Sequence, residues 1–231
     1  MIPSLRGLPR IFLPGASFEE PTELPREELD KLRKVLRLSS GAEVAILPDN
    51  GSLIRCRLQG HNVVPESVEW PNTEPALNLT LAQALPKGDK IDEIVRACTE
   101  LGVSKFVLFP SDRTVVRWDE KKVASRLQRL HVIAREAAEV SFRTKLPTVE
   151  WVPNLERVLA DHPAAIVLSE VEGLSPRLSV ASEMMTIVVG PEGGWSPREL
   201  SLIGPRGVSL GPRVLRVDHA GAAAAALLLL A

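Results

Sequence analysis

Three short segments of the sequence place glycine, proline and charged residues directly after apolar runs. They are residues 168–170 (LSE), 190–195 (GPEGGW) and 210–216 (LGPRVLR). The runs before them have the composition of buried strands, so we expect the segments at the carboxyl ends of parallel strands, where open α/β sheets bind their ligands. The three segments therefore predict one shared binding site.

The middle segment specifies its own backbone most fully. Gly193 and Gly194 permit positive φ angles and let a ligand approach the backbone closely. Residues 196–199 (SPRE) have the pattern of a capping box with proline at the first helical position, so a helix should begin there. The segment matches neither common glycine-rich phosphate-binding pattern, and Glu192 would repel a phosphate, which favours a neutral or cationic ligand. Taken alone, the segment is equally well explained as a tight strand-to-helix turn.

The elements that must position these segments follow from the apolar pattern after residue 75. Apolar runs alternate with amphipathic stretches, and the runs cover residues 77–85, 105–109, 164–169, 186–190 and 207–211. This alternation predicts an α/β domain whose parallel sheet is covered by helices on both faces. The first helix should have Asp89 as its N-cap and should end at Gly102 in a left-handed conformation. Cys98 lies on the apolar stripe of that helix, so we expect it in the core.

A different pattern covers the first seventy residues. Leucines at helical spacing over 27–37 precede three extended runs. Asn50-Gly51, between the first two runs, predicts a hairpin because both residues tolerate positive φ. Residues 70–75 (WPNTEP) are polar and bounded by proline, which predicts a linker. We therefore expect two domains, a small β-rich one over 1–70 and the α/β domain over 76–231.

Composition narrows the class of protein. The chain has 231 residues, 45% hydrophobic and 25% charged, which is typical of a folded soluble protein and excludes collagen-like, fibrous and disordered classes. Its 28 basic and 29 acidic residues leave a net charge of -1, so a site for a polyanion must be a local patch. Five Phe, four Trp and no Tyr offer little for a multi-base stacking surface, which argues against a passive single-strand binder.

Cysteine use and the two ends of the chain bear on location. Cys56 and Cys98 lie far apart without a CxxC motif or paired histidines, so we expect neither a disulfide nor a metal site. The N-terminal segment lacks the apolar core of a signal peptide. The last twelve residues (AGAAAAALLLLA) fall short of the roughly 20 that span a bilayer. We therefore expect a cytoplasmic protein, without a membrane partner, whose C-terminal segment is a buried helix.

Five strings of residues, spread over nearly the whole chain, resemble the ribosomal RNA small subunit methyltransferase E family of the SPOUT class. The strings are LPRIFL (8–13), KVLRL (34–38), DKIDEIVRACTELGV (89–103), IVVGPEGGWSPREL (187–200) and LGPRVLR (210–216). The last two, in this order and at this spacing, are highly specific. The resemblance implies an N-terminal PUA-like β-barrel that binds RNA over 1–70, a SPOUT domain with a deep trefoil knot over 76–231, and a homodimer.

The same resemblance implies a reaction and a cofactor. Members of the family transfer a methyl group from S-adenosylmethionine to N3 of a uridine in 16S ribosomal RNA, without a metal. Carried over position by position, the residues that bind the cofactor are Leu168, Gly190, Glu192, Gly193, Gly194, Leu210, Gly211, Val214 and Leu215. The sulfonium of the cofactor is cationic, so a carboxylate such as Glu192 is compatible with it.

Methylation at N3 requires loss of a weakly acidic imide proton and stabilisation of the resulting anion, which suits a guanidinium. Arg216 and Arg143 are the candidate guanidinium groups. Asp218, which corresponds to a glutamate of the family shortened by one carbon, is the candidate carboxylate beside Arg216. These three residues are the expected catalytic group.

The chain departs from the family pattern at two places. The family generally has Thr-Glu-Thr/Ala where this chain has residues 217–220 (VDHA), and Gln and Gly where it has Val140 and Phe142. Both places lie where we expect the chain to contact its RNA substrate. Two other functions therefore stay open: methylation of another ribosomal or transfer RNA position on the same scaffold, and RNA binding without turnover.

Positive charge is concentrated in one part of the sequence. Residues 113–145 contain nine Lys or Arg against four Asp or Glu. A helix over 119–139 would bury an apolar stripe and expose Lys122, Arg126 and Arg129 beside it. On an isolated helix such a stripe is more often a solvated face, but beside the methyltransferase motifs we predict that it binds RNA. The further RNA-binding candidates are Arg10, Arg33 and Arg37.

Overall fold

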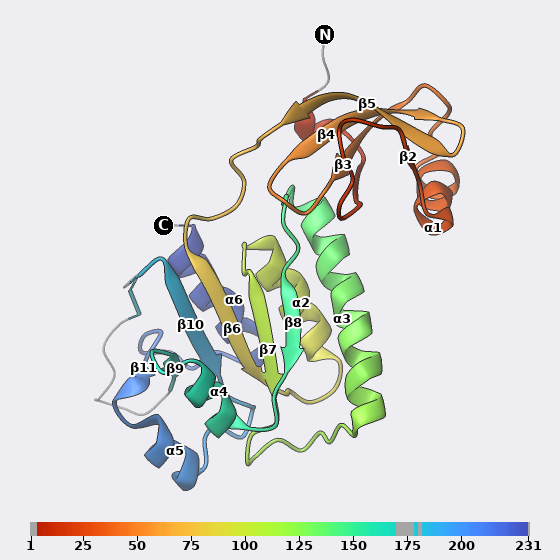
Figure 1. Ribbon diagram of the computed structural model, residues 1–231. Coiled ribbons are helices and arrows are strands. Elements are labelled where there is room, and N and C mark those ends of the chain that lie inside the picture. Colours follow the sequence, from red (N-terminus) through yellow and green to blue (C-terminus); the bar gives the residue numbers. More distant parts are fainter. Residues whose placement is uncertain (1–3, 170–177, 180–181, 231) are drawn as a thin grey trace. The chain divides into compact units, whose positions relative to one another are not determined.

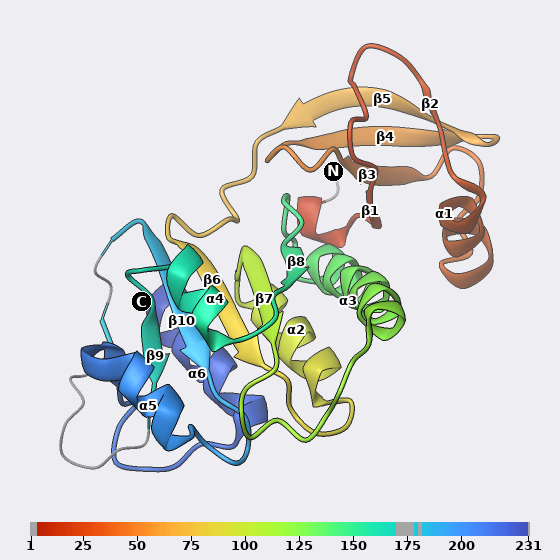
Figure 2. The ribbon, with the colours of Figure 1, turned by 60° about the horizontal axis from the view of Figure 1, so that its bottom comes forward.

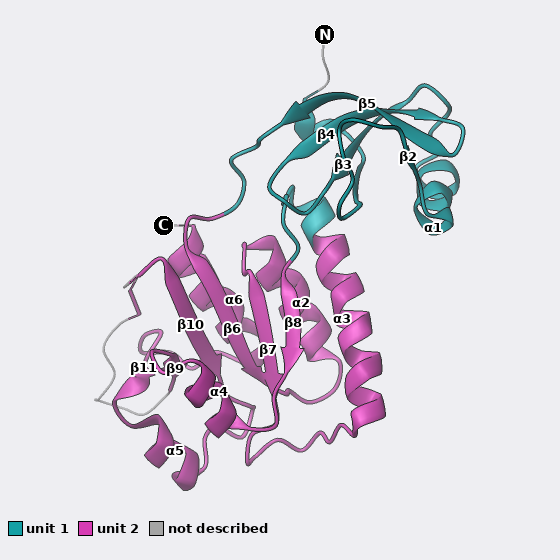
Figure 3. Cartoon of the chain, viewed as in Figure 1, with its two compact units in different colours: residues 1–74, 138–146 teal, residues 75–137, 147–231 magenta. Residues whose placement is uncertain are grey.

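The structure is a computed structural model that describes residues 4–169, 178–179 and 182–230. The chain separates into two compact units, coloured in Figure 3. The smaller unit consists of residues 1–74 and 138–146, and the larger one of residues 75–137 and 147–231. Each unit has its own sheet and its own buried core.

The larger unit contains a parallel sheet of six strands in the order β11-β9-β10-β6-β7-β8 (Figure 1). The strands are β6 (Asn78–Ala84), β7 (Lys105–Phe109), β8 (Thr148–Trp151), β9 (Ile166–Leu168), β10 (Met184–Val189) and β11 (Gly207–Val208). The helices are α2 (Lys90–Glu100), α3 (Glu120–Val140), α4 (Leu155–Asp161), α5 (Pro197–Ile203) and α6 (Val217–Leu229), with a 3-10 turn η3 (Gly204–Arg206). The predicted α/β architecture with a parallel sheet is confirmed.

Two strands differ from the sequence prediction. The run predicted over 207–211 pairs with β9 only through Gly207 and Val208, and the chain then leaves the sheet. Strand β8 was not predicted, because it lies at the edge of the sheet and its residues alternate between exposed and buried. An edge strand of this kind lacks the continuous apolar run that marks the central strands.

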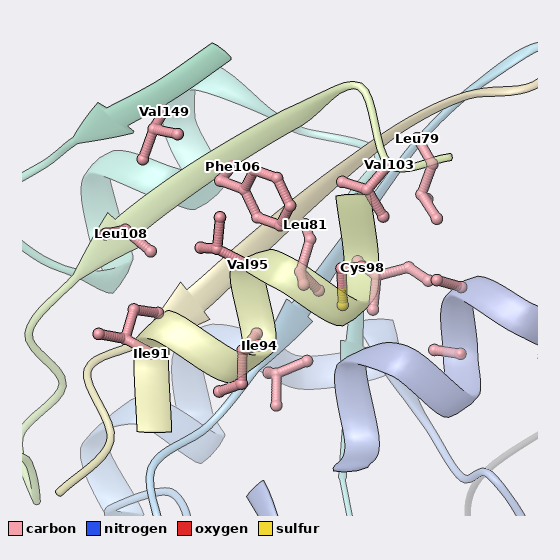
Figure 4. Close-up of a cluster of buried hydrophobic side chains, with 14 of the residues drawn as sticks. Leu79, Leu81, Ile91, Ile94, Val95, Cys98, Val103, Phe106, Leu108 and Val149 are labelled. Atoms are coloured by element: carbon pink, nitrogen blue, oxygen red, sulfur yellow. The ribbon is translucent and has the colours of Figure 1, made fainter. Parts of the chain in front are cut away.

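Buried side chains cover both faces of this sheet. On one face Leu81 and Phe106 pack against helix α2, as Figure 4 shows. The residues that α2 contributes to this cluster are Ile91, Ile94, Val95 and Cys98. On the other face Val107 and Val188 pack with Ile203 of α5 and with α4. The predicted apolar stripe of α2 and the buried position of Cys98 are confirmed.

The predicted C-terminal end of α2 is confirmed, whereas the predicted N-cap is not. Gly102 has a φ of 105°, as expected of a left-handed helix end, and a Cβ there would clash with the ring of Pro75. The cap at Asp89 is wrong, because its side chain makes no capping hydrogen bond. Its backbone (φ −98°, ψ 17°) is not in the extended conformation of capping residues. The carboxylate of Asp89 instead accepts from Arg126 NH2 at 3.0 Å.

Helix α6 packs closely against the sheet and α2 because one of its residues has no side chain. A Cβ at Gly221 would lie 3.0 Å from Leu81 Cδ2 and 3.7 Å from Cys98 Sγ. The predicted buried C-terminal helix is confirmed along this face, whereas Leu227 and Leu230 are 55% and 68% exposed. Within the described ranges, no helix is long and apolar enough to cross a membrane.

The smaller unit contains a five-stranded sheet in the order β1-β3-β4-β5-β2. The strands are β1 (Arg10–Phe12), β2 (Thr22–Glu23), β3 (Glu43–Leu47), β4 (Leu53–Gln59) and β5 (Asn62–Glu69), and a 3-10 turn η1 (Leu5–Gly7) precedes them. Strands β1 and β3 pair in parallel, and the other pairs are antiparallel. The helix predicted over 27–37 is present as α1 (Arg26–Asp30), which continues as a π-helical segment η2 (Lys31–Val35).

The hairpin between β3 and β4 is confirmed, with a different use of its turn residues. The positive φ angles are those of Asp49 (68°) and Gly51 (98°). Asn50 instead uses its side-chain oxygen to accept from Ser52 N at 2.9 Å. Asparagine and aspartate favour turns for two reasons, and each reason applies to one residue here. Asp49 tolerates a positive φ, and Asn50 forms a local hydrogen bond through its side chain.

Neither cysteine should react with a thiol reagent while the protein is folded. Cys56 and Cys98 are free thiols, 3% and 0% exposed, and burial raises the pKa of each to about 12. The thiolate is the reactive form, and an unfolded cysteine has a pKa of about 8.5. We expect no reaction in mildly alkaline buffer and complete reaction of both thiols in guanidinium, measured with a chromogenic thiol reagent. Rapid reaction of a thiol in the folded protein would contradict the closed core around it.

Candidate functional site

The three predicted segments lie at one edge of the parallel sheet. They follow the carboxyl ends of β9, β10 and β11, and Figure 2 turns this edge toward the viewer. Trp195 Nε1 donates to the Leu168 carbonyl at 3.0 Å, which joins the segment after β10 to the end of β9. Ser169 N donates to the Val208 carbonyl at 3.0 Å, which joins β9 to the end of β11. Glu170, the last residue of the first segment, lies outside the described residues.

The start of helix α5 has the predicted capping box. Ser196 Oγ accepts from Glu199 N at 3.1 Å, and the Glu199 carboxylate accepts from Ser196 N at 2.9 Å. Glu199 is fully buried, and its other oxygen accepts from Asp112 N at 3.0 Å. The capping carboxylate therefore also holds the loop that follows β7.

That loop is a fourth segment of the site and was not among the three predicted segments. The Asp112 carboxylate accepts from Ser196 Oγ at 2.5 Å and from Arg198 NH2 at 2.6 Å, and these bonds, that of Arg198 first, hold its pKa below the usual range. The next residue, Arg113, donates from NH1 to the Gly193 carbonyl at 2.8 Å. The sequence did contain a signal for this segment, because it follows the carboxyl end of the apolar run 105–109. Arg113 was considered only as one of the basic residues of 113–145.

The glycines of the middle segment differ in what surrounds them. A Cβ at Gly190 would lie 3.0 Å from the Trp195 ring, and one at Gly193 would lie 3.2 Å from Arg113 Cβ. Gly194 has a φ of 66°, and a Cβ there would meet no atom of the described residues within 4 Å. Gly211 of the third segment has a φ of 127° and equally open surroundings. Gly194 and Gly211 therefore present backbone to open space, where a ligand can approach it.

Glu192 joins the middle segment to a further loop. Its Oε1 accepts from Lys90 Nζ at 2.6 Å and from Lys87 N at 3.1 Å, so it connects to the residues between β6 and α2. Burial raises the pKa of this carboxyl, but the hydrogen bonds from Lys90 and Lys87 outweigh it and the pKa is lowered. Glu192 is therefore ionised and its charge is balanced by Lys90, a partner that the sequence analysis did not anticipate.

The third segment carries apolar side chains and leads into α6. Leu210 is partly buried against the core and Leu215 is half-buried, whereas Val214 is 74% exposed. Arg216 Nε donates to Asp218 Oδ1 at 3.1 Å, which orients a guanidinium that is itself 69% exposed. Burial raises the pKa of Asp218, but hydrogen bonds from the backbone and Arg216 lower it overall.

Arg143, the other predicted guanidinium, belongs to the smaller unit. It is 4% exposed and donates from Nε and NH2 to Glu74 Oε2, at 3.2 and 2.8 Å. The second oxygen of Glu74 accepts from Thr144 N at 2.7 Å and from Lys145 N at 3.1 Å. These bonds hold the turn after α3.

The cationic stripe predicted on α3 is largely paired. Arg126 NH2 lies 3.0 Å from Asp89 Oδ1, and Arg129 donates from Nε and NH2 to Asp92 Oδ2 at 2.9 and 2.6 Å. Lys122 is exposed. The charge available to RNA on this helix is therefore smaller than the count of basic residues indicates.

The three candidates in the smaller unit differ in their contacts. Arg10 donates from Nε to the Glu139 carbonyl at 2.7 Å, and its guanidinium lies 5.0 Å from the centre of the Phe142 ring. Arg33 NH2 donates to the Gly60 carbonyl at 2.6 Å. Arg37 is exposed and has a φ of 55°. No group of three or more residues that could hold a metal occurs among the residues that the structure covers.

Comparison with known proteins identifies the family to which the residues of this site belong. Residues 73–229 match the RNA methyltransferase domain family. The chain is 32% identical over 223 residues to the ribosomal RNA small subunit methyltransferase E of Bacillus subtilis, covering 87% of each chain. It is 34% identical over 222 residues to the protein of that name from Synechocystis, covering 89% of this chain and 72% of the relative.

Solved structures give the same picture. A ribosomal RNA small subunit methyltransferase E from Neisseria gonorrhoeae, bound to S-adenosyl methionine, is similar with a TM-score of 0.85 and 28% identity, over 95% of this chain and 96% of that one. A putative methyltransferase from Legionella pneumophila, with bound cofactor SAM, is similar with a TM-score of 0.86 and 25% identity over the same shares. The part of the chain that carries the parallel sheet and its loops is thus an RNA methyltransferase domain. The chain as a whole belongs to the ribosomal RNA small subunit methyltransferase E family.

Proposed function

We propose that this chain transfers a methyl group from S-adenosylmethionine to 16S ribosomal RNA, at N3 of a uridine. The observation that carries the proposal is the group of joined loops at the carboxyl edge of the sheet, where glycine backbone borders open space. Small subunit ribosomal RNA is the substrate in the names of the relatives. The choice of uridine N3 rests on the resemblance of the motifs in residues 187–200 and 210–216.

The residues of the three loops fit this cofactor. When bound, S-adenosylmethionine supplies a methyl group on a cationic sulfonium, an electrophile that needs no metal. Gly194 and Gly211 would let the cofactor approach the backbone, and the exposed Val214 offers an apolar contact. The remaining predicted cofactor residues line or support the same loops; they are Leu168, Gly190, Glu192, Gly193, Leu210 and Leu215.

In this proposal Arg216 stabilises the uracil anion. Loss of the N3 proton to solvent spreads negative charge over the two flanking carbonyl oxygens, where a guanidinium can donate, and N3 then takes the methyl group as its bond to sulfur breaks. Asp218 engages Nε of Arg216, and among the residues that the structure describes the two terminal nitrogens have no other hydrogen-bond partner. Asp218 then acts as an ionised orienting group. The ion pair with Glu74 favours a structural role for Arg143 over the catalytic one that we predicted.

The two domains divide the work in this proposal. Residues 1–70 form a PUA-like RNA-binding domain, which the five-stranded sheet supports, and residues 76–231 form a SPOUT domain whose knot binds the cofactor. The likeness to the Neisseria structure over 95% of the chain supports both assignments. Lys122, Arg126 and Arg129 on α3 and Arg10, Arg33 and Arg37 stay predicted RNA contacts. A ribosomal RNA substrate implies the cytoplasm as the place of action.

Gly194→Val should abolish binding of S-adenosylmethionine, because the side chain would occupy the open space beside the loop. Calorimetric titration measures the loss. Gly204→Val is the matched control, since Gly204 also has a positive φ (53°) and open surroundings but lies at the end of α5. Undiminished heat for Gly194→Val, or an equal loss in the control, would contradict the assignment of the cofactor to this loop.

Arg216→Gln should lower kcat for RNA methylation by roughly 100-fold or more, the usual effect of removing a donor to a developing anion. Its affinity for S-adenosylmethionine should stay unchanged. Arg213→Gln, an exposed arginine of the same loop, is the control and should keep kcat within a few-fold. Methylation of small-subunit RNA lacking the modification, followed by mass spectrometry of its nucleosides, measures the rate and names the product.

The same assay separates the alternative functions. A methylated nucleoside other than 3-methyluridine would move the proposal to another RNA position. Binding of S-adenosylmethionine with no methylated RNA from any ribosomal or transfer RNA substrate would identify an RNA-binding protein without turnover. Absence of both cofactor binding and methylation would contradict the proposed function entirely.

We also propose a homodimer, because α6 leaves apolar side chains uncovered in a single chain. Leu227 is 55% exposed and should lie in the interface. Light scattering at micromolar concentration should give twice the chain mass for the parent and a lower mass for Leu227→Lys. Val132→Lys, a 52% exposed valine on α3, is the control and should keep the dimer. A monomer mass for the parent would contradict the proposal.

A further inference from the structure

The loop between β7 and α3 carries outward-facing cations that the catalytic proposal does not use. Arg113, Val115 and Arg117 are exposed, Val115 by 70%, whereas Thr114 is buried and Val116 packs against the core. The side chains therefore alternate, and the exposed set places an apolar residue between two arginines. We call residues 113, 115 and 117 the loop strip. In Figure 1 the loop leaves the end of β7 and runs below the sheet to the start of α3.

Contacts at both ends hold the loop strip in place. At the first end Ser111 N donates to Thr114 Oγ1 at 2.9 Å, and Thr114 N donates to the Ser111 carbonyl at 3.0 Å. At the other end Trp118 stacks on Trp151 of β8, with ring centres 5.4 Å apart. A surface held at both ends loses little conformational freedom when a ligand binds.

The loop strip is continuous with the cofactor loop. Arg113 donates through NH1 to the Gly193 carbonyl at 2.8 Å, next to Gly194 whose backbone borders open space. A molecule that contacts the strip therefore lies beside the proposed site of methyl transfer.

Charge also favours the loop strip over α3. Among the residues that the structure covers, neither Arg113 nor Arg117 pairs with a carboxylate, whereas Arg126 and Arg129 on α3 pair with Asp89 and Asp92. Two acidic residues, Asp119 and Glu120, follow the strip at the start of α3, and Asp119 Oδ1 accepts from Lys122 N at 2.8 Å. The strip thus keeps unpaired guanidinium charge, the group that best contacts phosphates.

We propose that the loop strip binds single-stranded RNA beside the target nucleotide, with Arg113 and Arg117 on phosphates and Val115 against a ribose or base. The proposal rests on the proposed function, because N3 lies on the pairing edge of uracil and is accessible only in an unpaired base. It assigns RNA contacts to residues other than the stripe of Lys122, Arg126 and Arg129. Because phosphate contacts read no sequence, a single strand of mixed sequence is a sufficient probe.

The test compares two pairs of arginines in the full chain. Arg113→Gln with Arg117→Gln should weaken binding to a labelled single strand and reduce the slope of log affinity against log salt by about 1.4, or about 0.7 for each phosphate contact on single strands. Arg126→Gln with Arg129→Gln, the matched pair, should change the slope by less. Arg117→Gln alone should reduce it by about 0.7 and leave S-adenosylmethionine affinity unchanged, since only Arg113 contacts the cofactor loop.

The outcomes separate this proposal from the proposed function. An unchanged salt slope in the Arg113/Arg117 variant, with a loss in the Arg126/Arg129 variant, would overturn the proposal and restore α3 as the RNA surface. An equal loss of affinity for a fully paired duplex would overturn the preference for single strands. Failure of the parent to bind S-adenosylmethionine or to methylate RNA would instead contradict the proposed function, whatever the salt slopes show.

Discussion

Glu199 places a carboxylate at the point where the loop after β7 meets the start of α5. The group is fully buried, and a buried polar group without hydrogen bonds is costly, but here its two oxygens accept from the backbone amides of Ser196 and Asp112. Without the carboxylate the buried Ser196 amide would lack its partner, at a cost of about 1–3 kcal/mol. The position of Arg113 depends on this junction, because Arg113 directly follows Asp112. Gly193 is joined to it in turn, because its carbonyl accepts from the Arg113 guanidinium.

Around this junction the site combines fixed side chains with open backbone. Arg198 pairs with Asp112 and with Glu156 of α4, Trp195 bonds to the end of β9, and Glu192 bonds to Lys90. These contacts come from the loop after β7, from α4, from the end of β9 and from Lys90, and among the described residues none would meet a Cβ at Gly194. The loops therefore have little need to reorganise when a ligand binds, which lowers the entropic cost of binding.

The sequence predicted what depends on local pattern and missed what depends on partners distant in the chain. The central strands, the stripe of α2 and the capping box at Ser196 follow from spacing over a few residues, and all are present. The pairs Arg126–Asp89, Arg129–Asp92 and Arg143–Glu74 each join residues that no periodicity relates. A count of basic residues therefore overstated the charge on α3.

The same limit explains the smaller differences. Asp89 stands at the correct position for a cap, but a guanidinium from α3 takes its carboxylate. The segment 138–146 has no compositional mark that separates it from α3, yet it belongs to the unit formed by the first part of the chain. Arg113 follows a predicted strand, and that place in the sequence was a signal for a site residue. Its importance could not be recognised from the sequence, because it depends on the contact with Gly193.

The contact between Lys87 and Glu192 has a consequence for the order in which the protein is assembled. The two residues lie 105 positions apart, and the strands that precede them, β6 and β10, pair side by side in the middle of the sheet. Closing so large a loop of unfolded chain costs entropy before any contact compensates it, so parallel pairing of this kind forms slowly. A nascent chain in which β10 has not yet been synthesised therefore contains β6, β7, β8 and β9 but none of the middle segment. The site is therefore completed only in the last third of synthesis.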